Sequence, residues 1–382
     1  MQTDQLTKIV EITEGTTKLL VPEESLKINA PPRDPAFFNT NAKLNRDFSI
    51  IAYSSFLKNF KGPKIFFDSL AGLGARSIRV ANEIKTVEKV LINDVNTRSI
   101  ELAIKSSKLN NVQNCEFSEN EACRFLSLHS KRGERGAIID IDPFGSPSRY
   151  IDCGIRATIH GGVLSVTATD LQVLHGLFQN SCKRRYYGVP VRAEFGNEIA
   201  LRLILGCINL VAQRLDVQCL PLFVQNYMHY YRVYVRVLVR SDSKDKMGFI
   251  SYCKACGHRL IQQDQENSCE ICKQKTEMAG PLWIGELYDG QFIDAMLEEY
   301  QKYNLDKRCK KILIKSRAEA NMPATYFTLD KIASKMKSAP LGLEKALEKL
   351  RTTGYVASPT SLNPAGFRTN CKMDQIIRIF TN

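Results

Sequence analysis

The sequence contains no run of 18 apolar residues, which is about the length that a helix needs to cross a bilayer. Its longest apolar stretch, 199–212, is interrupted by Arg202 and is typical of a helix in a globular protein. The first residues are polar and carry charges of both signs, unlike a secretion signal. We therefore expect a cytoplasmic protein without a membrane-embedded part, whose 12 cysteines are kept in a reducing compartment.

A complete dinucleotide-binding fingerprint is also missing. Gly72 and Gly74 follow a short strand pattern at 64–68 that ends in Asp68, but no third glycine completes G-x-G-x-x-G. Glycines at this point allow the backbone to approach a ligand at the N-terminus of the following helix. Asp94 ends the next strand pattern, where a carboxylate can bind ribose hydroxyls. The pattern disfavours a nicotinamide and favours a nucleoside cofactor without a pyrophosphate, most commonly S-adenosylmethionine.

Length and charge limit the organisation of the chain. A chain of 382 residues, of which 44% are hydrophobic, can form two or three domains with real cores. The formal net charge is +13, and residues 301–382 hold 16 Lys and Arg against six Asp and Glu. This excess favours a polyanionic partner, although basic proteins can also simply be soluble.

The most informative segment is Asp142-Pro143-Phe144, which follows an apolar run at 137–139. That run predicts a buried strand, and ligands of open α/β sheets bind outside the carboxyl ends of such strands. The Asp142 carboxylate and the Pro143 carbonyl can both accept an N–H from an exocyclic amine, and Phe144 can stack on the ring. The segment therefore suits a planar heterocycle with an amino group. The alternative is a plain turn, in which Asp caps and Pro bends the chain.

Residues 1–62 predict an N-terminal extension that begins with a β-hairpin. Phe37 and Phe38 are adjacent and cannot share one face of an extended segment, so we expect one in the core and the other free to stack on a substrate. A helix is predicted at 44–60, with Arg46 in its first turn, where a cation is unfavourable to the helix dipole. Arg46 either faces an anion or is solvated, and the sequence leaves both open.

Residues 63–240 alternate strand and helix patterns, as in a doubly wound, Rossmann-like sheet. Strand patterns at 220–229 and 231–240 would close the sheet, and the second has one apolar and one basic face. The basic face is either solvated surface or a track for RNA. At 183–187 cations interleave with aromatic rings, which suits phosphates and stacked bases, whereas a solvated loop is the alternative.

Residues 241–300 begin with a polar linker at 241–246 and contain two C-x2-C pairs that are separated by 12 residues. Pairs at this spacing indicate a zinc ribbon, and four thiolates complete a tetrahedron without an open position, so the metal would be structural. Four unmetallated thiols, or His258 as a ligand, are the alternatives. The remaining eight cysteines are predicted to be small buried residues. The predicted ligands are Cys253, Cys256, Cys269 and Cys272.

Residues 301–382 predict a basic, winged-helix-like segment. Amphipathic helices are predicted at 329–336 and 341–350, with Pro340 at the start of the second, and 355–369 would form the wing. Such segments bind nucleic acid in many proteins and mediate only protein contacts in others.

Several of these segments together resemble one family, the tRNA guanine-26 N2-dimethyltransferases of archaea and eukaryotes, which are class I methyltransferases. The resemblance covers nearly the whole chain, and Asp-Pro-Phe-Gly at 142–145 and Thr-Ala-Thr-Asp at 167–170 are its most specific motifs. Further matching segments are Glu14-Gly15, Phe37-Phe38-Asn39, Asn45-Arg46-Asp47, Arg184-Arg185-Tyr186, the cysteine pairs, Gly280-Pro281-Leu282-Trp283 and the segment 364–369.

The resemblance implies that methyl groups pass from S-adenosylmethionine to N2 of guanine 26 in tRNA, directly and without a covalent enzyme intermediate. It implies an α/β fold: a Rossmann-like methyltransferase domain with an N-terminal extension, and a tRNA-binding C-terminal part with a zinc ribbon and a winged-helix-like segment. No obligate protein partner is inferred. The implied catalytic residues are Asp142, Pro143 and Phe144, with Phe37 or Phe38 as a second ring against guanine. The implied cofactor contacts are Arg46, Arg76, Asp94, Glu121 and Ala122, and the glycine loop adds Asp68 and Gly72.

Two alternatives to this function stay open. One is a methyltransferase for another nucleic-acid amine, such as adenine N6, and the other is a non-enzymatic zinc-ribbon RNA-binding protein on a methyltransferase scaffold. The sequence also leaves open the number of methyl groups added, modification of a neighbouring guanine, the choice of tRNAs and the oligomeric state.

Overall fold

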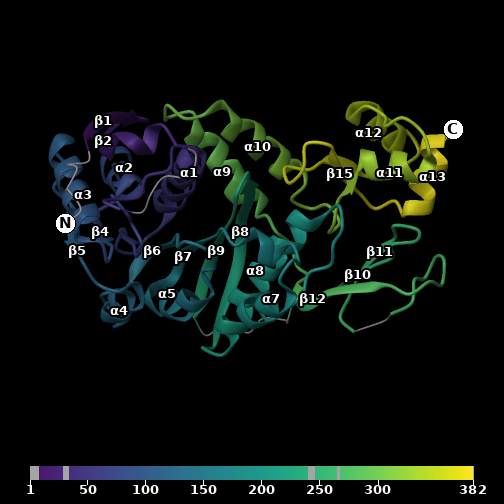
Figure 1. Ribbon diagram of the computed structural model, residues 1–382, viewed down its shortest axis with the longest axis horizontal. Helices are drawn as coiled ribbons and strands as arrows, with labels where there is room; N and C mark the ends of the chain where they lie inside the picture. Colours follow the sequence, from purple (N-terminus) through teal and green to yellow (C-terminus); the bar gives the residue numbers. More distant parts are fainter. Residues whose placement is uncertain (1–7, 29–33, 240–245, 265–266, 382) are drawn as a thin grey trace, which may run out of the picture. The chain divides into compact units, whose positions relative to one another are not determined.

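The computed structural model describes residues 8–28, 34–239, 246–264 and 267–381 (Figure 1). Most of the linker predicted at 241–246 lies outside these residues. The chain forms two compact units, and each takes segments from distant parts of the sequence. The first unit comprises Met1–Pro143, Tyr150–Val166 and Asp294–Lys311, and the second comprises Phe144–Arg149, Thr167–Ile293 and Ile312–Asn382.

The central element is a sheet of seven strands in the order β5-β4-β3-β6-β7-β9-β8. Strands β3 to β7 pair in parallel wherever they are neighbours, and β8 pairs with β9 antiparallel. All six residues of β6 are buried, as expected for a parallel strand that is covered on both faces. The strands are β3 (Ile65–Asp68), β4 (Lys89–Asn93), β5 (Cys115–Ser118), β6 (Gly136–Ile141), β7 (Thr158–Ala168), β8 (Val217–Tyr227) and β9 (Tyr230–Val239).

The strand order reverses between β3 and β6. From β3 the chain moves outward to β4 and β5, and then returns to the other side of β3 with β6 and β7. Connections on opposite faces leave a crevice at such a point, outside the carboxyl ends of the strands. This arrangement confirms the predicted α/β class, and it makes the ends of β3, β4 and β6 the expected ligand site.

Helices and a hairpin complete the first unit. The predicted hairpin is confirmed as β1 (Ile9–Glu14) paired with β2 (Thr17–Pro22). The predicted helices at 44–60 and 75–84 are observed within one residue at each end. The helices are α1 (Lys43–Asn59), α2 (Ala75–Glu83), α3 (Thr97–Leu109), α4 (Ala122–Leu128) and α5 (Ile151–Ala157), with short 3-10 turns at Glu23–Leu26, Thr40–Ala42 and Ser148–Tyr150.

A buried ion network joins α1, α2 and the hairpin. Arg79 is fully buried and contacts Asp47 at 2.6 Å and Glu83 at 2.9 Å. Arg46 binds Glu14 through two hydrogen bonds of 2.6 and 2.8 Å. Breaking a buried pair of this kind costs about 3–5 kcal/mol because it strands the other charge. The alternative left open for Arg46 is thereby decided, because this residue faces an anion on β1.

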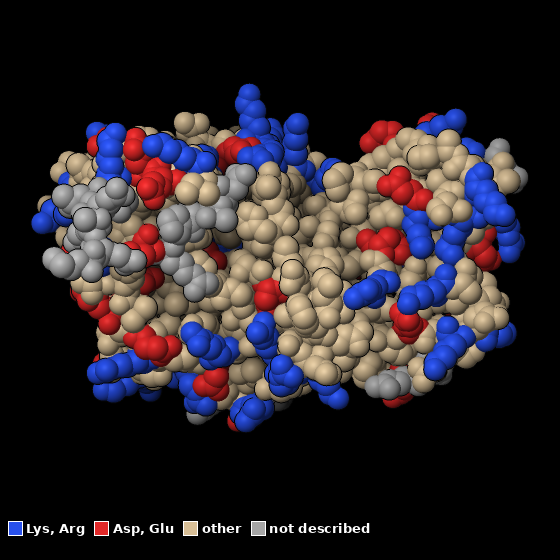
Figure 2. Space-filling view, in the orientation of Figure 1, with Lys and Arg blue, Asp and Glu red and all other residues tan. Residues whose placement is uncertain are grey.

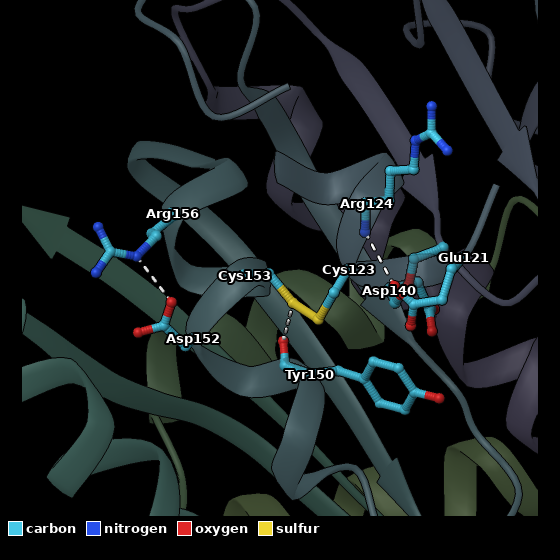
Figure 3. The surroundings of a disulfide bond; sticks show 9 residues. Glu121, Cys123, Arg124, Asp140, Tyr150, Asp152, Cys153 and Arg156 are labelled. Atoms are coloured by element: carbon cyan, nitrogen blue, oxygen red, sulfur yellow. Dashed lines mark hydrogen bonds and ion pairs between the residues drawn. A yellow bond between two sulfur atoms is a disulfide. The ribbon is translucent and has the colours of Figure 1, made fainter. Parts of the chain in front are cut away.

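Two cysteines depart from the prediction for the eight that lie outside the zinc pattern. Cys123 on α4 and Cys153 on α5 are joined by a disulfide, 30 residues apart in sequence (Figure 3). They were expected to be small buried residues like the others. Their pairing follows from the parallel sheet, which places the helices before and after β6 in contact, and this proximity could not be read from scattered cysteines.

The second unit holds the central helices, a three-stranded ribbon and the C-terminal elements. Its helices are α6 (Leu171–Leu174), α7 (Gln179–Tyr186), α8 (Gly196–Gln213), α11 (Leu329–Met336), α12 (Leu343–Thr352) and α13 (Met373–Thr381). The ribbon has the order β11-β10-β12, with β10 (Met247–Tyr252), β11 (Arg259–Gln262) and β12 (Glu277–Trp283). The helices α9 (Gly290–Tyr300) and α10 (Lys307–Ala318) occupy the segment between the ribbon and the C-terminal elements.

The C-terminal elements have the arrangement that the winged-helix pattern predicts. The strands β13 (Phe327–Thr328), β14 (Ala357–Pro359) and β15 (Gly366–Thr369) form a small sheet in the order β13-β15-β14. Its apolar core includes Ile332, Leu347, Phe367 and Ile376. Pro340 is not the start of a helix, because α12 begins at Leu343 with Gly342 as its N-cap.

Lys and Arg side chains are distributed over the face shown in Figure 2, with Asp and Glu among them. In the part of the chain that is described, no helix combines the length and the apolar character needed to span a membrane.

Candidate active site

The carboxyl ends of three neighbouring strands carry aspartates. Asp68 ends β3, Asp94 follows β4, and Asp140 and Asp142 lie at the end of β6. Asp68 and Asp140 are register partners on adjacent strands, and both are buried. Four carboxylates at the point where the strand order reverses define a candidate active site in the first unit.

The glycine loop is held open toward this edge by Asp94. Gly72 and Gly74 have φ values of 56° and 78°, a left-handed conformation that favours glycine. The Gly72 N–H donates to Asp94 Oδ2 at 2.7 Å, and the Asn96 N–H donates to Oδ1 at 2.9 Å. A Cβ at Gly74 would meet the Ala103 Cβ at 2.8 Å, so the loop packs closely on α3. The loop therefore offers backbone to a ligand, with Asp94 beside it, as a nucleoside-binding loop requires.

Asp68 has little access to solvent. Ser77 donates to its Oδ2 at 2.5 Å. Burial raises the pKa of Asp68 to about 7, the neighbouring charge of Asp140 raises it further, and Arg76 acts in the opposite direction. Asp68 is thus poised to hold a proton near neutral pH, unlike a carboxylate at the surface.

Asp140 anchors the arginine that holds Asp142. Tyr53 on α1 donates to Asp140 Oδ2, and the Tyr53 hydroxyl also lies 2.5 Å from Ser165 Oγ on β7. Arg76 Nε lies 3.3 Å from the same Asp140 oxygen. The network therefore fixes Arg76 from below, through groups that are buried on three elements.

Asp142 is the exposed end of this network. Its Oδ2 accepts a hydrogen bond from Arg76 Nη2, and 27% of its side chain remains accessible. Arg76 Nη1 also donates to Asn45 Oδ1 at 2.8 Å and to Ser49 Oγ. Arg76 was predicted as a cofactor contact, and here its guanidinium orients the predicted catalytic carboxylate. An accessible carboxylate with one oxygen fixed by an arginine can accept an N–H from a substrate amine.

The remaining predicted contacts of the first unit differ in accessibility. Phe38 is buried beneath the Arg46 guanidinium, which lies 4.9 Å from the centre of its ring. Phe37 is only half-buried, so it is the ring of the pair that can reach a substrate. Arg46 also donates to the Asn39 carbonyl at 3.1 Å, so its charge and its donors serve the hairpin and this loop.

Glu121 and Ala122 lie where α4 begins. Glu121 is the N-cap of this helix, and its Oε2 accepts a hydrogen bond from the Arg124 N–H at 3.1 Å. Its side chain is exposed, whereas Ala122 is buried. Figure 3 shows Glu121 in front of Asp140, next to the helix that carries Cys123. A capping carboxylate can still accept hydrogen bonds from a ligand through its other oxygen.

Phe144 and Gly145 belong to the second unit. Phe144 is 52% exposed, as a ring that stacks on a substrate must be, and the preceding Pro143 is buried. The loop is fixed by Thr169, because the Gly145 N–H donates to Thr169 Oγ1 at 2.7 Å and the Thr169 N–H donates to the Gly145 carbonyl at 2.9 Å. The two most specific motifs of the sequence are thus hydrogen-bonded to each other.

Four residues that organise the site were not predicted. Asp140, Tyr53 and Asn45 position Arg76, and Glu14 neutralises Arg46. One sequence feature could have identified Asp140, since a carboxylate inside an apolar strand two positions before Asp142 points to the same side of that strand. The other three act across the fold and have no local pattern.

The four predicted zinc ligands come together in the second unit. Their Sγ atoms lie within 4.8 Å of one another, with Cys253 and Cys272 at 3.4 Å and Cys256 and Cys269 at 3.6 Å. A Zn–S distance of about 2.3 Å gives tetrahedral S–S edges of roughly 3.8 Å. The cluster is therefore compatible with a structural zinc ion, which these four thiolates would hold without an open position.

Each cysteine pair lies in the same type of turn. The Gly257 N–H donates to the Cys253 carbonyl at 2.7 Å, and the Lys273 N–H donates to the Cys269 carbonyl at 2.9 Å. Gly257 and Lys273 occupy equivalent places and both have positive φ, 81° and 59°. His258 is not needed as a ligand, because its Nε2 lies 2.9 Å from Glu270.

Known proteins share this sequence and this architecture. Residues 15–381 match the family model described as N2,N2-dimethylguanosine tRNA methyltransferase. A tRNA (guanine(26)-N(2))-dimethyltransferase of Methanobrevibacter smithii is 33% identical over 382 residues, which are 97% of each chain. A tRNA (guanine(26)-N(2)/guanine(27)-N(2))-dimethyltransferase of Aquifex aeolicus is 29% identical and covers 96% of this chain and 94% of its own.

A solved structure extends the similarity to three dimensions. The complex of Trm1 from Pyrococcus horikoshii with S-adenosyl-L-methionine superposes with a TM-score of 0.83 at 26% identity, over 97% of this chain and 99% of the other. The resemblance inferred from the motifs is confirmed over nearly the whole length. The chain belongs to the N2,N2-dimethylguanosine tRNA methyltransferase family.

Proposed function

We propose that this protein transfers methyl groups from S-adenosylmethionine to the exocyclic N2 of guanine 26 in tRNA, giving N2-methyl- and N2,N2-dimethylguanosine. The observation that carries the proposal is the position of Asp142, an accessible carboxylate fixed by Arg76 at the carboxyl end of β6. Full-length similarity to tRNA guanine-26 dimethyltransferases supports the choice of substrate. A cytoplasmic location is part of the proposal, since tRNA is the substrate.

In the proposed reaction Asp142 acts as the acceptor for the amine. Its free oxygen accepts one N–H of guanine N2, which turns the nitrogen lone pair toward the methyl donor and out of conjugation with the ring. S-adenosylmethionine, when bound, supplies an electrophilic methyl group on its sulfonium. Asp142 then takes up or relays the proton that the amine loses as the new C–N bond forms. Arg76 keeps the carboxylate oriented, so that the rate comes chiefly from positioning and electrostatics.

The rings and loops around Asp142 have complementary roles in this proposal. Phe144 stacks on the extruded guanine, the Pro143 carbonyl accepts a second N–H, and Phe37 is the ring of its pair that can contact the base. The cofactor lies against the glycine loop, whose left-handed Gly72 leaves room for close approach. The residues that would hold it are Arg46, Asp68, Gly72, Arg76, Asp94, Glu121 and Ala122.

Nucleoside analysis of tRNA after incubation with the protein and S-adenosylmethionine tests this function. We expect N2-methylguanosine and N2,N2-dimethylguanosine, mapped to position 26 by fragment analysis, and no product with tRNA in which position 26 is adenosine. A methylated adenine amine would instead assign the protein to another nucleic-acid amine. Absence of any methylated nucleoside, with tRNA binding retained, would assign it to non-enzymatic RNA binding. Product at position 27 would extend the activity to the neighbouring guanine.

A further inference from the structure

Two large aromatic rings stand exposed at the two ends of α7 in the second unit. Phe178, before the helix, is 53% exposed, and Tyr187, after it, is 48% exposed, while the preceding Leu177 is also exposed. An eight-residue helix is about 12 Å long, so the rings are separated by more than one nucleotide of a stacked strand. Exposed apolar side chains gathered on one element are unusual in a soluble protein and indicate an interaction surface.

Tyr187 adopts a conformation that a tyrosine rarely takes. It is the C-cap residue of α7, with φ 62° and ψ −1°, a place where glycine is usual because a Cβ is disfavoured there. A bulky side chain in this region persists only where the surroundings hold it, and such positions cluster at functional sites. The backbone therefore accepts strain in order to present this ring at the surface.

Charge accompanies the rings. Lys183, Arg184 and Arg185 lie in the last turn of α7 and are all exposed. Arg185 is committed to Asp170, with its Nη1 2.9 Å from Oδ2, whereas the charges of Lys183 and Arg184 face no carboxylate among the described residues. Two uncompensated cations between two exposed rings form a surface for a polyanion with planar groups, which is a nucleic acid.

The same helix is tied to the loop that carries Phe144. Tyr186 donates to Asp170 Oδ1 at 2.6 Å, next to the Arg185 contact with the same carboxylate. Asp170 follows Thr169, which holds Gly145 through the two hydrogen bonds described above. Two consecutive residues at the end of β7 therefore fix the position of α7 and of the Phe144 loop together.

We propose that α7 is a positioning surface for the tRNA strand beside the target guanine, with Phe178 and Tyr187 stacked on bases and Lys183 and Arg184 on phosphates. This inference rests on the proposed function, in which guanine leaves its stack and its neighbours lose a stacking partner. Exposed rings replace such a partner without regard to sequence. No covalent step is involved, because α7 acts by holding the RNA and not by touching the reacting atoms.

Tyr187→Gly separates this role from a structural one. Glycine adopts the left-handed conformation without a Cβ penalty, so the variant should fold with little change in melting temperature. It removes the ring, and we expect a rise in KM for tRNA of about 10-fold, in the range of one lost base-aromatic stack. Calorimetry should find an unchanged affinity for S-adenosylmethionine. Tyr187→Phe keeps the ring and should retain the wild-type KM.

Lys183→Gln and Arg184→Gln test the charges. Each should lower the slope of log K for tRNA binding against log salt by roughly one, because one phosphate contact is lost. Lys105→Gln is the matched control, since Lys105 is an exposed lysine on α3 that removes the same charge elsewhere. It should leave the slope nearly unchanged.

The outcomes separate this inference from the proposed function. Wild-type protein that makes no N2-methylated guanosine overturns the function and the inference with it. Active wild-type protein together with a Tyr187→Gly variant of normal KM, or glutamine variants with the slope of the Lys105→Gln control, overturns the inference alone. In that case the exposed rings serve another partner, such as a protein.

Discussion

Asp142 depends on groups that are buried beneath it. Arg76 binds its Oδ2 and is itself held by Asp140, Asn45 and Ser49. We expect Asp142→Ala to lower the single-turnover rate of tRNA methylation by a factor of roughly 100 or more, the range for loss of a general base. Asp142→Asn keeps one acceptor oxygen and should fall between alanine and wild type, or match alanine where charge is the main term.

Two further measurements on the same variants exclude a structural explanation. Affinity for S-adenosylmethionine should change little, because Asp142 faces the methyl acceptor. Loss of a turn-forming aspartate alone would lower stability by about 1 kcal/mol and leave turnover mostly intact. A folded alanine variant that methylates tRNA at nearly the wild-type rate would falsify the catalytic assignment.

Asp68 should make stability depend on pH. Its pKa is raised by burial to about 7, whereas an unfolded chain has the ordinary value of 3.8. Between these values the folded state binds more protons than the unfolded state, so the contribution of Asp68 to stability falls as pH rises from about 4 to about 7. Above pH 7 the loss is complete.

Asp68→Asn tests this assignment, because the amide oxygen can still accept from Ser77 and cannot ionise. Denaturant unfolding between pH 4 and 8 should give a variant whose stability, relative to wild type, increases over the lower part of this range and levels off near 7. A difference that stays constant with pH would contradict the raised pKa. The comparison cancels the other carboxylates, which titrate alike in both proteins.

The sequence predicted the residues that carry chemistry better than the residues that hold them. Asp94 and Asp142 follow apolar strands, and that pattern is local and readable. Glu14 pairs with Arg46 across 32 residues, and nothing near either residue announces the contact. Which of Phe37 and Phe38 is buried likewise depends on Arg46, which covers Phe38. Side-chain partners across the fold are set by packing, and a single sequence does not contain that information in readable form.

The two knuckles of the ribbon are the elements most dependent on an ion. Each has a cysteine pair around a turn with a left-handed residue, and few apolar contacts are available to a three-stranded ribbon alone. We expect one zinc per chain by metal analysis. Cys256→Ser should lose the zinc and lower the melting temperature, with S-adenosylmethionine affinity largely retained.

Cys309→Ser is the matched control for that variant. Cys309 is a buried thiol outside the cluster, so serine should lower stability through an unmatched hydroxyl and leave one zinc per chain. Folded wild-type protein that carries no metal, and whose melting temperature does not respond to a chelator, would refute a structural zinc site.

Element boundaries were predictable where a short repeat defined them. The strands β3 and β4 and the helices α1 and α2 lie within one residue of their predicted positions, because apolar periodicity ends at clear turns. Pro340 misled the prediction for α12, since Gly342 caps that helix instead. The basic stretch from 301 contains most of α10, which its charges concealed. Charged residues on a helix surface weaken the apolar pattern by which helices are recognised.

Buried charges bind the C-terminal strands into the second unit. Arg368 on β15 lies 2.9 Å from Glu198 on α8 and 2.5 Å from Glu319, and all three residues are buried. Arg202 adds a contact of 2.8 Å to the same Glu198. Truncation of the C-terminal segment would leave Glu198 and Arg202 exposed to solvent or mispaired. Surface charges therefore give a cleaner test of tRNA binding than deletion.

We expect the excess charge of residues 301–382 to bind phosphates of tRNA. A triple variant with Lys331→Gln, Lys337→Gln and Lys345→Gln removes three exposed charges from α11, α12 and the turn between them. The dependence of tRNA affinity on salt should become shallower by up to about three contacts' worth, while S-adenosylmethionine affinity is unchanged. A triple variant of Lys105, Lys108 and Lys131 carries the same change of charge elsewhere. Equal slopes for both triples would argue against a specific role of the C-terminal segment.

The bridge between Cys123 and Cys153 closes a covalent ring around the catalytic strand. Residues 123–153 contain β6 and Asp142, and also the exposed turn at 131–134. Limited trypsin digestion should nick this turn after Lys131 or Arg132. The two fragments should then migrate as one species on a gel without reductant and separate when the bridge is reduced. Fragments of the Cys153→Ser variant should separate in both cases, and separation of wild-type fragments without reductant would refute the bridge in solution. A nicked chain would keep both ends of its catalytic strand tethered, so a single cut in this turn would not release the reaction centre.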